Sequence, residues 1–567
     1  MRVGAEQHGI FAKAYSGTTG VLLAFDVAEE LRRGLLGFAV EREIRSGRRA
    51  GERAWLQGIL DFAGSMKAPG RLIDTNLAPV QKFRWSDYAV YPSTAYAYTV
   101  YAVHAAGPVP VTAEDRRLRL TQGPMLEVFT QGFDGSTAAI FNRAVASSQA
   151  FSRRFPEIDK EIETARRAAS LETFSLPARA LDWLSRGLVE RIEAFLAQAL
   201  DDSWSVDLAI YEYELPRLHA SIVAAAKRGA KVRVVYHART SDPAAAENEH
   251  MLAHPPIPGA MLYPRATSKI MHDKFVVLSR IVGQGARAPY CVLAGSTNWT
   301  ENGCYRQANV VQTTSDPELV VDYARMFETL VETHEDVKAT RRWITANNTI
   351  PAVPEKFAGF SPRTGGGDLE AIVRMVAAAR RDVFFLTAFD LRREILEALK
   401  GSPNDRILRL GLQNKRSSIT GLHRDRTADF SAAVLLPGGI EGWLKETMAG
   451  QRGSIRIHTK AIVVDATSDE PLVLSGSHNL SASASSGNDE NFMVIRGDTE
   501  LADVYLCEMM RMYDHYRFRF AAKERQKPGV PLDPPMLAGD DSWTEAYFST
   551  GSMKELDRLC FAGRPVA

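Results

Sequence analysis

The sequence predicts an α/β protein of two similar halves, with one sheet per half, helices outside, and a mostly-β region in front. The first observation is a strand, helix and strand pattern that occurs twice, in residues 205–236 and 382–412. The second is a pair of short motifs, His-x-Lys and Gly-Ser-x-Asn, that occurs once in each half beside apolar runs. The third is the Tyr- and Val-rich alternation of residues 93–103, which is typical of a strand. Repeated units of this kind indicate an internal duplication.

We expect the mostly-β region over residues 1–135. The apolar run at residues 20–25 predicts an early strand, and a turn at Pro92 leads into the strand of residues 93–103. The Pro-x-Thr-x-Tyr-x-Tyr-x-Val pattern there resembles the late hairpin of fibronectin type III sandwiches, and an unrelated small β domain is the alternative. Residues 136–200 follow as a helical linker, because their apolar residues recur at helical spacing.

The two halves are expected over residues 201–355 and 356–567, the second with a C-terminal extension. Each begins with a strand, helix and strand, which predicts a right-handed crossover between parallel strands. Between the halves, Asp316 suits the N-cap and Pro317 the first residue of a further helix. The crossover elements are expected at residues 205–211, 218–228 and 231–236, and at residues 382–387, 392–400 and 407–412.

Composition sets wide limits on function. A chain of 567 residues predicts two to four domains. The net charge of +1 gives no global argument for a nucleic acid or an anionic membrane as partner. The four cysteines form no Cys-x-x-Cys pair and are expected to be structural thiols. With no signal-peptide pattern and no long apolar stretch, we expect a cytoplasmic protein without an integral membrane segment.

The duplicated motif holds the residues best suited to catalysis. The first copy is His272-x-Lys274 with Gly-Ser296-x-Asn298, and the second is His458-x-Lys460 with Gly-Ser477-x-Asn479. One His-x-Lys triplet arises easily by chance. Two copies in matching frames indicate one active site built from both halves of the chain.

These residues resemble the signature of the phospholipase D superfamily, His-x-Lys-x4-Asp followed by Gly-Ser-x-Asn, over roughly residues 175–520. The second copy matches in full through Asp465, whereas the first has Ser279 at the acidic position. The resemblance implies a phospholipase D-like pseudo-dimer of two mixed sheets flanked by helices. It places the site at the seam between the halves of a single chain, which we expect to be a monomer.

The resemblance also implies a phosphodiester hydrolase and a role for each motif residue. One histidine attacks phosphorus to form a phosphohistidine, and the other protonates the leaving alcohol and then activates water. His272 is expected to be the nucleophile and His458 the acid, with the reverse assignment as the alternative. The remaining groups would bind the non-bridging oxygens through charge or hydrogen bonds. These are Lys274, Lys460, Asn298, Asn479, and the hydroxyls of Ser296 and Ser477.

A further acid should orient each histidine. Glu490 fills this position in the second half, whereas residues 307–309 offer the first half an amide or nothing. We count Asp465 with the catalytic set, with a stabilising role around the motif, and we expect Asp273 to face solvent. No metal-binding motif or cysteine pair accompanies the histidines, so neither a metal nor another cofactor is expected.

The substrate class stays open at this stage. The leading hypothesis is a phospholipid or a related diester, and the second is DNA or RNA cleaved by the same metal-independent site. A nuclease should have a basic groove with stacking aromatic residues, whereas a lipase needs an exposed apolar rim. A catalytically inactive binding scaffold is a third possibility, supported only by Ser279 in place of an aspartate.

Overall fold

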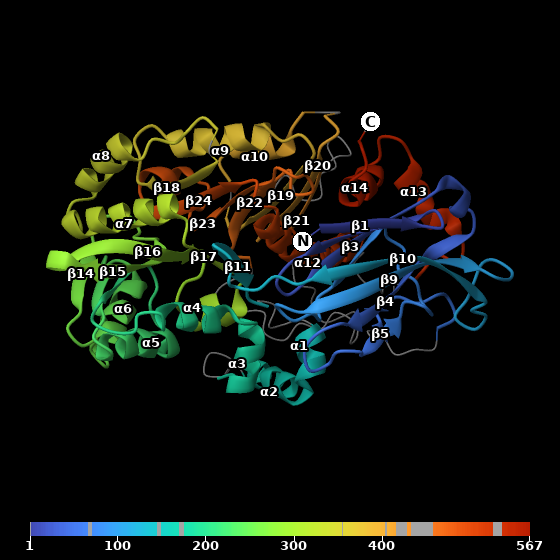
Figure 1. The fold of residues 1–567 in the computed structure, drawn as a ribbon, viewed down its shortest axis with the longest axis horizontal. Coiled ribbons are helices and arrows are strands. Elements are labelled where there is room, and N and C mark those ends of the chain that lie inside the picture. The colour runs from blue at the N-terminus through green and yellow to red at the C-terminus, as the bar shows by residue number, and fades with distance from the viewer. Residues whose placement is uncertain are drawn as a thin grey trace.

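The computed structural model describes residues 2–65, 71–143, 149–168, 175–353, 355–389, 391–402, 405–414, 428–432, 457–525 and 536–566. It confirms the predicted fold class. Two mixed seven-stranded sheets are flanked by helices, and two smaller β-sheets precede them. Figure 1 shows the N-terminal sheets on one side of the molecule and the two larger sheets stacked beside them.

The N-terminal region is a sandwich of two antiparallel four-stranded sheets around one core, in which the rings of Phe25 and Phe38 stack 4.7 Å apart. The predicted early strand and the Tyr-rich strand are both present, as β3(Val21–Val27) and β9(Ala95–Ala105). The likeness to a fibronectin type III domain stays a prediction. One sheet has the order β1(Arg2–Gln7), β2(Ile10–Ser16), β3(Val21–Val27) and β8(Arg84–Asp87), and the other β10(Leu118–Phe129), β9(Ala95–Ala105), β4(Leu35–Ile44) and β5(Arg53–Trp55). The short strands β6(Gln57–Gly58) and β7(Ile73–Asp74) pair separately.

The two large sheets have the same strand order, position by position. In each, three strands run parallel at one end, and the central strand of the sheet also pairs with an antiparallel hairpin. The first sheet runs β11(Thr137–Phe141), β17(Val310–Thr314), β16(Ala286–Gly295), β15(Lys274–Val282), β12(Trp204–Ile210), β13(Lys231–His237), β14(Met261–Arg265). The second runs β18(Lys356–Ser361), β24(Glu490–Arg496), β23(Leu472–Gly476), β22(Lys460–Val464), β19(Asp382–Thr387), β20(Leu408–Gln413), β21(Ala428–Ala432).

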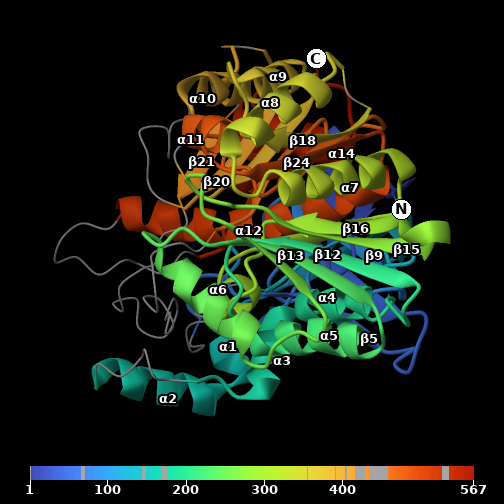
Figure 2. The ribbon, with the colours of Figure 1, turned by 90° about the vertical axis from the view of Figure 1, so that its left-hand side faces the viewer.

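Helices cover the outer faces of both sheets and fill the space between them. In Figure 2, α7(Pro317–Glu332) and α12(Thr499–Arg525) lie between the two sheets, and their apolar residues join one core with the inner sheet faces. The middle helices are α7(Pro317–Glu332) and α12(Thr499–Arg525), and α8(Val337–Asn347) follows α7. The first half has α3(Ala178–Ser185), α4(Leu188–Leu196), α5(Pro216–Lys227) and α6(Pro243–Ala253) outside. The second has α9(Gly367–Ala377), α10(Arg393–Lys400) and α11(Ala482–Ser486).

The expected helical linker contains a strand. Helices α1(Gln149–Arg154) and α2(Pro156–Arg167) and then α3 and α4 do form there, but β11 precedes them and pairs with β17. Ile140 and Phe141 are buried in that strand, so apolar burial outweighs the helical composition around it. We therefore propose that the first half begins near residue 137 rather than at residue 201.

The C-terminal extension returns to the N-terminal sandwich. Helix α13(Glu545–Phe548) places Tyr547 against Phe83 with ring centroids 4.9 Å apart. Helix α14(Met553–Ala562) lies between the sandwich and the second half, where Phe561 contacts Phe384 and accepts a hydrogen bond from the Tyr15 hydroxyl through its carbonyl. The extension thus ties the two ends of the chain together.

Candidate active site

The two motif histidines meet where the halves join. The strand segments before them cross over to the opposite half, where the His272 amide donates to the Asp489 carbonyl (2.8 Å) and the His458 amide to the Ala308 carbonyl (2.9 Å). The imidazole rings lie with centroids 6.3 Å apart. Both rings are at least 94 % buried. The backbone pairing therefore holds two imidazoles that are shielded from solvent, with the edge of one ring towards the face of the other.

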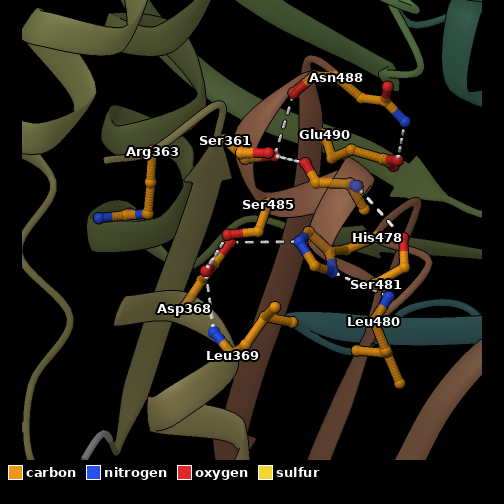
Figure 3. Close-up of polar contacts among 12 residues, drawn as sticks. Ser361, Arg363, Asp368, Leu369, His478, Leu480, Ser481, Ser485, Asn488 and Glu490 are labelled. Atoms are coloured by element: carbon orange, nitrogen blue, oxygen red, sulfur yellow. Dashed lines mark hydrogen bonds and ion pairs between the residues drawn. The ribbon is translucent and has the colours of Figure 1, made fainter. Parts of the chain in front are cut away.

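Glu490 orients the histidine of the other half, not that of its own. Its Oε2 lies 2.7 Å from His272 Nδ1, which corrects the expectation that it serves the second-half histidine. The Ser477 hydroxyl donates to the same oxygen (2.9 Å), and the Asn488 amide donates to Oε1 (3.0 Å). Figure 3 shows Glu490 and Asn488 side by side in this arrangement. The physical reason is the strand crossing, which brings residue 489 against the first-half histidine.

Asn309 holds the same position for His458. Its Oδ1 lies 3.0 Å from His458 Nδ1, and the Ser296 carbonyl lies at the same distance. The Ser296 hydroxyl donates to Asn309 Oδ1 (2.8 Å), as Ser477 does to Glu490. An amide of the first half therefore orients the second-half histidine, whereas the sequence led us to expect an amide or no partner for the first-half histidine.

These partners determine which ring nitrogen carries the proton. A carbonyl oxygen only accepts hydrogen bonds, so His458 Nδ1 must be the donor. The Glu490 carboxylate likewise requires a donor at His272 Nδ1, because its pKa lies below the usual range. In both neutral histidines Nε2 is consequently the unprotonated nitrogen that is left for chemistry.

Burial keeps the site short of protons in the absence of an anion. It lowers the pKa of His272 to about 4 against the opposing effect of Glu490. Burial, with the charges of Lys460 and Lys274, lowers the pKa of His458 well below its usual value. Burial also lowers the pKa of Lys274 to about 8 and that of Lys460 well below normal. A bound phosphodiester anion would raise all four pKa values, since it stabilises every cationic form.

The lysines and asparagines present polar atoms to the space beside the histidines. Lys274 Nζ donates to the His272 carbonyl (2.6 Å) and lies 5.2 Å from the centre of the Tyr211 ring. Within the described part of the chain, the buried Lys460 Nζ has no hydrogen-bond partner, and neither has Oδ1 of Asn298 or Asn479. The lysine ammonium can bind a phosphoryl oxygen, whereas the two amide oxygens can accept a hydrogen bond from a substrate hydroxyl.

The two serines act differently from the expectation. Their hydroxyls donate to Asn309 and Glu490, and each accepts from the backbone amide that follows its orienting residue. Both hydroxyls are thus engaged in holding the histidine partners rather than facing a phosphate. The hydroxyls bind there because Ser296 and Ser477 lie at the ends of strands that pair with the strands next to Asn309 and Glu490.

Asp465 lies away from the histidines. It follows the end of β22, about 16 Å along the chain from Lys460 at roughly 3.3 Å per strand residue. It adopts a left-handed φ of 53°, and its Oδ1 accepts from the backbone amides of Arg380 (2.9 Å) and Arg381 (2.7 Å). It therefore belongs to a turn that anchors β19 and not to the catalytic set. In the first half β15 continues to Val282 past an irregularity in its pairing at Ser279, so there is no equivalent turn for an acid to anchor.

Asp273 is buried, contrary to the expectation that it faces solvent. Its Oδ1 accepts from the Asn491 amide (2.7 Å), whose own oxygen accepts from the Tyr323 hydroxyl (3.0 Å). Burial raises the pKa of Asp273 to about 8, and the neighbouring charge of Asp489 adds to this effect. The side chain links the first half, the second half and α7.

Sequence reasoning missed Glu212, which touches a motif residue. Its carboxylate accepts a hydrogen bond from the Asn298 amide, and its charge acts on Lys274. Next to it, the Tyr211 ring lies 5.2 Å from the His272 ring, and its hydroxyl donates to Asp242 (3.0 Å). A signal was available, because Glu212 follows the carboxyl end of a predicted strand, where α/β sheets bind ligands.

His478, the variable residue of the second Gly-Ser-x-Asn motif, points away from the site. Figure 3 shows its ring directed at Asp368, with Nε2 3.2 Å from Oδ2 of that buried carboxylate. The Ser485 hydroxyl also donates to Asp368. This network packs α9 and α11 against the loop that carries Asn479.

No group of three or more His, Cys, Asp or Glu side chains suited to a metal ion occurs among the described residues. The helices in the same part of the chain include none with the length and apolar character needed to cross a bilayer.

Comparisons with known proteins show which family and which solved structures the chain is similar to. Residues 196–331 match the family model described as "Cardiolipin synthase, PLD-like domain". No curated protein matches the chain significantly. Among solved structures, polyphosphate kinase from Porphyromonas gingivalis is 12% identical with a TM-score of 0.38, and the match covers 54% of this chain and 43% of the kinase.

Two further structures are comparably distant. Phosphatidylserine synthase from Haemophilus influenzae is 13% identical with a TM-score of 0.40, covering 59% of this chain and 85% of the synthase. Nuc, a phospholipase D family member from Salmonella typhimurium, is 23% identical with a TM-score of 0.20, covering 25% of this chain and 84% of Nuc. Likenesses of this size carry no argument about substrate. The family match places residues 196–331 in the phospholipase D superfamily, and the second copy of the motif, in residues 458–479, repeats the same signature.

Proposed function

We propose that the protein hydrolyses a phosphodiester of a phospholipid or a related small diester through a phosphohistidine on His272. The observation that carries this proposal is the pair of buried imidazoles whose Nδ1 atoms are both held by acceptors, beside two lysines. Enzymes of the superfamily act on phosphodiesters, which supports the same chemistry. The carboxylate on His272 and the amide on His458 support a division of roles between them.

In the first step His272 Nε2 attacks phosphorus and forms a P–N bond while the P–O bond to the leaving alcohol breaks. Protonated His458 gives its Nε2 proton to that alcohol. The negative Glu490 stabilises the positive charge that develops on the His272 ring, whereas Asn309 cannot do so for His458. His272 is therefore the better nucleophile.

In the second step neutral His458 takes a proton from water, whose oxygen attacks phosphorus as the P–N bond breaks. This restores free His272 and protonated His458, so atoms and charges balance over the cycle. Lys274, Lys460 and the amides of Asn298 and Asn479 are placed to stabilise the five-coordinate phosphorus in both steps.

Activity on several diesters in parallel would test this function. The purified protein would be assayed on bis(para-nitrophenyl) phosphate, phosphatidylcholine vesicles, and single- and double-stranded nucleic acid. We expect hydrolysis of the small diester and the lipid, with acid-labile phosphate on the His272 peptide after a rapid quench of the His458→Asn protein. Turnover of nucleic acid alone would contradict the proposed substrate. Label on the His458 peptide in the His272→Asn protein would reverse the two roles.

A further inference from the structure

Each half holds the backbone just before its motif histidine with a side chain from the end of a parallel strand. In the first half the Met271 amide donates to His237 Nδ1 (3.2 Å), and in the second the Ile457 amide donates to Asn414 Oδ1 (3.4 Å). The two side chains are equivalent, because each comes directly after the last residue of its strand that pairs with the central strand, β13 with β12 and β20 with β19. One position of the repeated scaffold therefore carries an imidazole in one half and an amide in the other.

The hydrogen bond from Met271 determines the protonation state of His237. A backbone amide only donates, so Nδ1 must be unprotonated and the single proton of the neutral ring must lie on Nε2. Nε2 lies 3.2 Å from Oδ2 of Asp242, a carboxylate that can accept. A second proton, on Nδ1, would place one N–H against another, so the protonated ring cannot keep the contact with Met271. The amide oxygen of Asn414 has no such limit, because an amide does not titrate.

His237 acts on His272 by two routes. Along the backbone, Met271 is the residue directly before His272. Through side chains, Asp242 Oδ2 also accepts from the Tyr211 hydroxyl (3.0 Å), and the Tyr211 ring lies 5.2 Å from the rings of both His237 and His272. Burial raises the pKa of Tyr211, so its hydroxyl keeps the proton that it donates. Loss of the His237 contact would therefore loosen both the backbone and the ring packing that place His272.

The surroundings keep the His237 ring neutral at neutral pH. The residue is completely buried, and burial lowers its pKa below the usual value. The charges of Asp242 and of Asp489 from the second half oppose this effect, whereas Arg239 adds to it. Asp489 is itself paired with the buried Arg265 (2.8 Å), which offsets part of its charge. The ring therefore takes up a second proton only in acid.

We propose that His237 is a positioning residue for His272 and makes the first half of the site sensitive to acid, whereas Asn414 holds the backbone before His458 at any pH. This inference rests on the proposed function, because it assigns a regulation to the same site. When His237 takes up a proton, the hydrogen bond from Met271 is lost and His272 is no longer held for attack. Acid then acts on the enzyme through a residue that does not touch the substrate.

The pH dependence of kcat/KM tests this role. Wild type, His237→Asn and His237→Leu would be assayed on bis(para-nitrophenyl) phosphate between about pH 4.5 and about pH 8.5. His237→Asn copies the second half, because it keeps an acceptor for Met271 without a titrating group. Its kcat at about pH 8 should stay within about threefold of the wild type, and its loss of kcat/KM in acid should be at least about threefold smaller. His237→Leu removes the acceptor and should lower kcat about 10- to 100-fold at every pH with little change in KM, the same scale as for partners that orient metal-bound histidines.

Two controls separate position from folding. His254→Ala, at an exposed position, should keep the wild-type profile, and thermal unfolding of each variant shows whether it is folded. If His237→Leu does not fold, the profile of His237→Asn decides alone. Identical profiles of wild type and His237→Asn, or near-wild-type kcat in a folded His237→Leu protein, would overturn the inference.

Nitrogen NMR of the histidine rings gives a measurement that needs no turnover. In the isotope-labelled full-length chain, His237→Asn and His272→Asn would assign the two rings. We expect an unprotonated Nδ1 on His237 at about pH 8 and a shift of the His272 signals as His237 is protonated, absent from His237→Asn. The same His272 titration in wild type and His237→Asn would contradict the positioning role. A shift that depends on His237, in a protein that hydrolyses no diester, would instead refute the proposed function alone.

Discussion

The two halves of the active site share a scaffold and differ in charge. Each contributes a histidine, a lysine and an asparagine at matching strand positions, and each lends an orienting residue to the other half. The orienting residue is Glu490 for His272 but Asn309 for His458. Duplication thus supplies two equivalent imidazoles. We propose that the carboxylate makes His272 the better nucleophile, whereas the amide leaves His458 easier to deprotonate.

Removal of either histidine should have the largest effect on activity. His272→Ala and His458→Ala should each lower the rate of diester hydrolysis by roughly 10²- to 10⁴-fold, the usual scale for a lost acid–base group. The double variant should be little worse than either single one, because residues that act as a unit are not additive. The measurement is kcat on bis(para-nitrophenyl) phosphate, with His254→Ala at an exposed position as the control. Near-wild-type activity in either single variant would show that the site is not shared.

Substitution of the two orienting residues should show how the roles of the two histidines differ. Glu490→Gln removes the charge beside His272 and should lower kcat about 10- to 100-fold, the same scale as for partners that orient metal-bound histidines. Asn309→Asp places a carboxylate beside His458 and should raise the pKa of that histidine. The pH–rate profile then separates the two effects, since only Asn309→Asp should move the limb that reports the general acid to higher pH. Equal losses from both substitutions with unchanged profiles would mean that the residues serve packing alone.

Much of this arrangement was predictable from the sequence, and the exceptions share a cause. The sheets, the crossover helices and the motif residues follow from local apolar patterns and spacing. The pairing of Glu490 with His272 does not, because it depends on where two distant strands cross. Glu212 escaped notice because its neighbours Tyr211 and Tyr213 look like the end of an ordinary buried strand. The motif includes Asp465 and so suggests that it belongs to the site. Its role in the turn is visible only in the structure, where it accepts a hydrogen bond from the backbone just before β19.

The buried Asp273 should make stability depend on pH. Its pKa is about 8 in the folded protein against an ordinary value of 3.8, so the folded state holds a proton that the unfolded state releases between those values. This stabilisation is complete below the ordinary pKa and is lost as the pH rises towards 8. His272 acts in the opposite direction, because its lowered pKa of about 4 costs stability as the pH falls from 6.5.

Asp273→Asn retains an acceptor for Asn491 and removes the ionisable proton. The variant should lose less stability than the wild type between about pH 5 and pH 8, with a difference in Tm of a few degrees. Thermal unfolding at about pH 5 and at pH 8 would measure this difference in Tm. Asp541→Asn is the matched control, because Asp541 is a partly exposed aspartate in the C-terminal segment. Identical slopes of Tm against pH in wild type and variant would show that Asp273 is ionised in the folded state.

The smallest effect on catalysis should come from Asp465, which the family signature nevertheless includes. Its carboxylate accepts two short backbone hydrogen bonds at the start of β19, and such bonds to a charged group are each worth about 1.5–3 kcal/mol. Asp465→Ala should therefore lower the free energy of unfolding by a few kcal/mol, roughly the sum of one or two of them, while kcat stays within about threefold. Asp465→Asn should be milder, because it keeps an acceptor and tolerates the left-handed φ of 53°.

Urea unfolding and steady-state kinetics on the same preparations separate the effect on stability from the effect on kcat. A large loss of kcat at unchanged stability would return Asp465 to the catalytic set. It would mean that the turn at Asp465, at one end of β22, affects the chemistry at Lys460, at the other end.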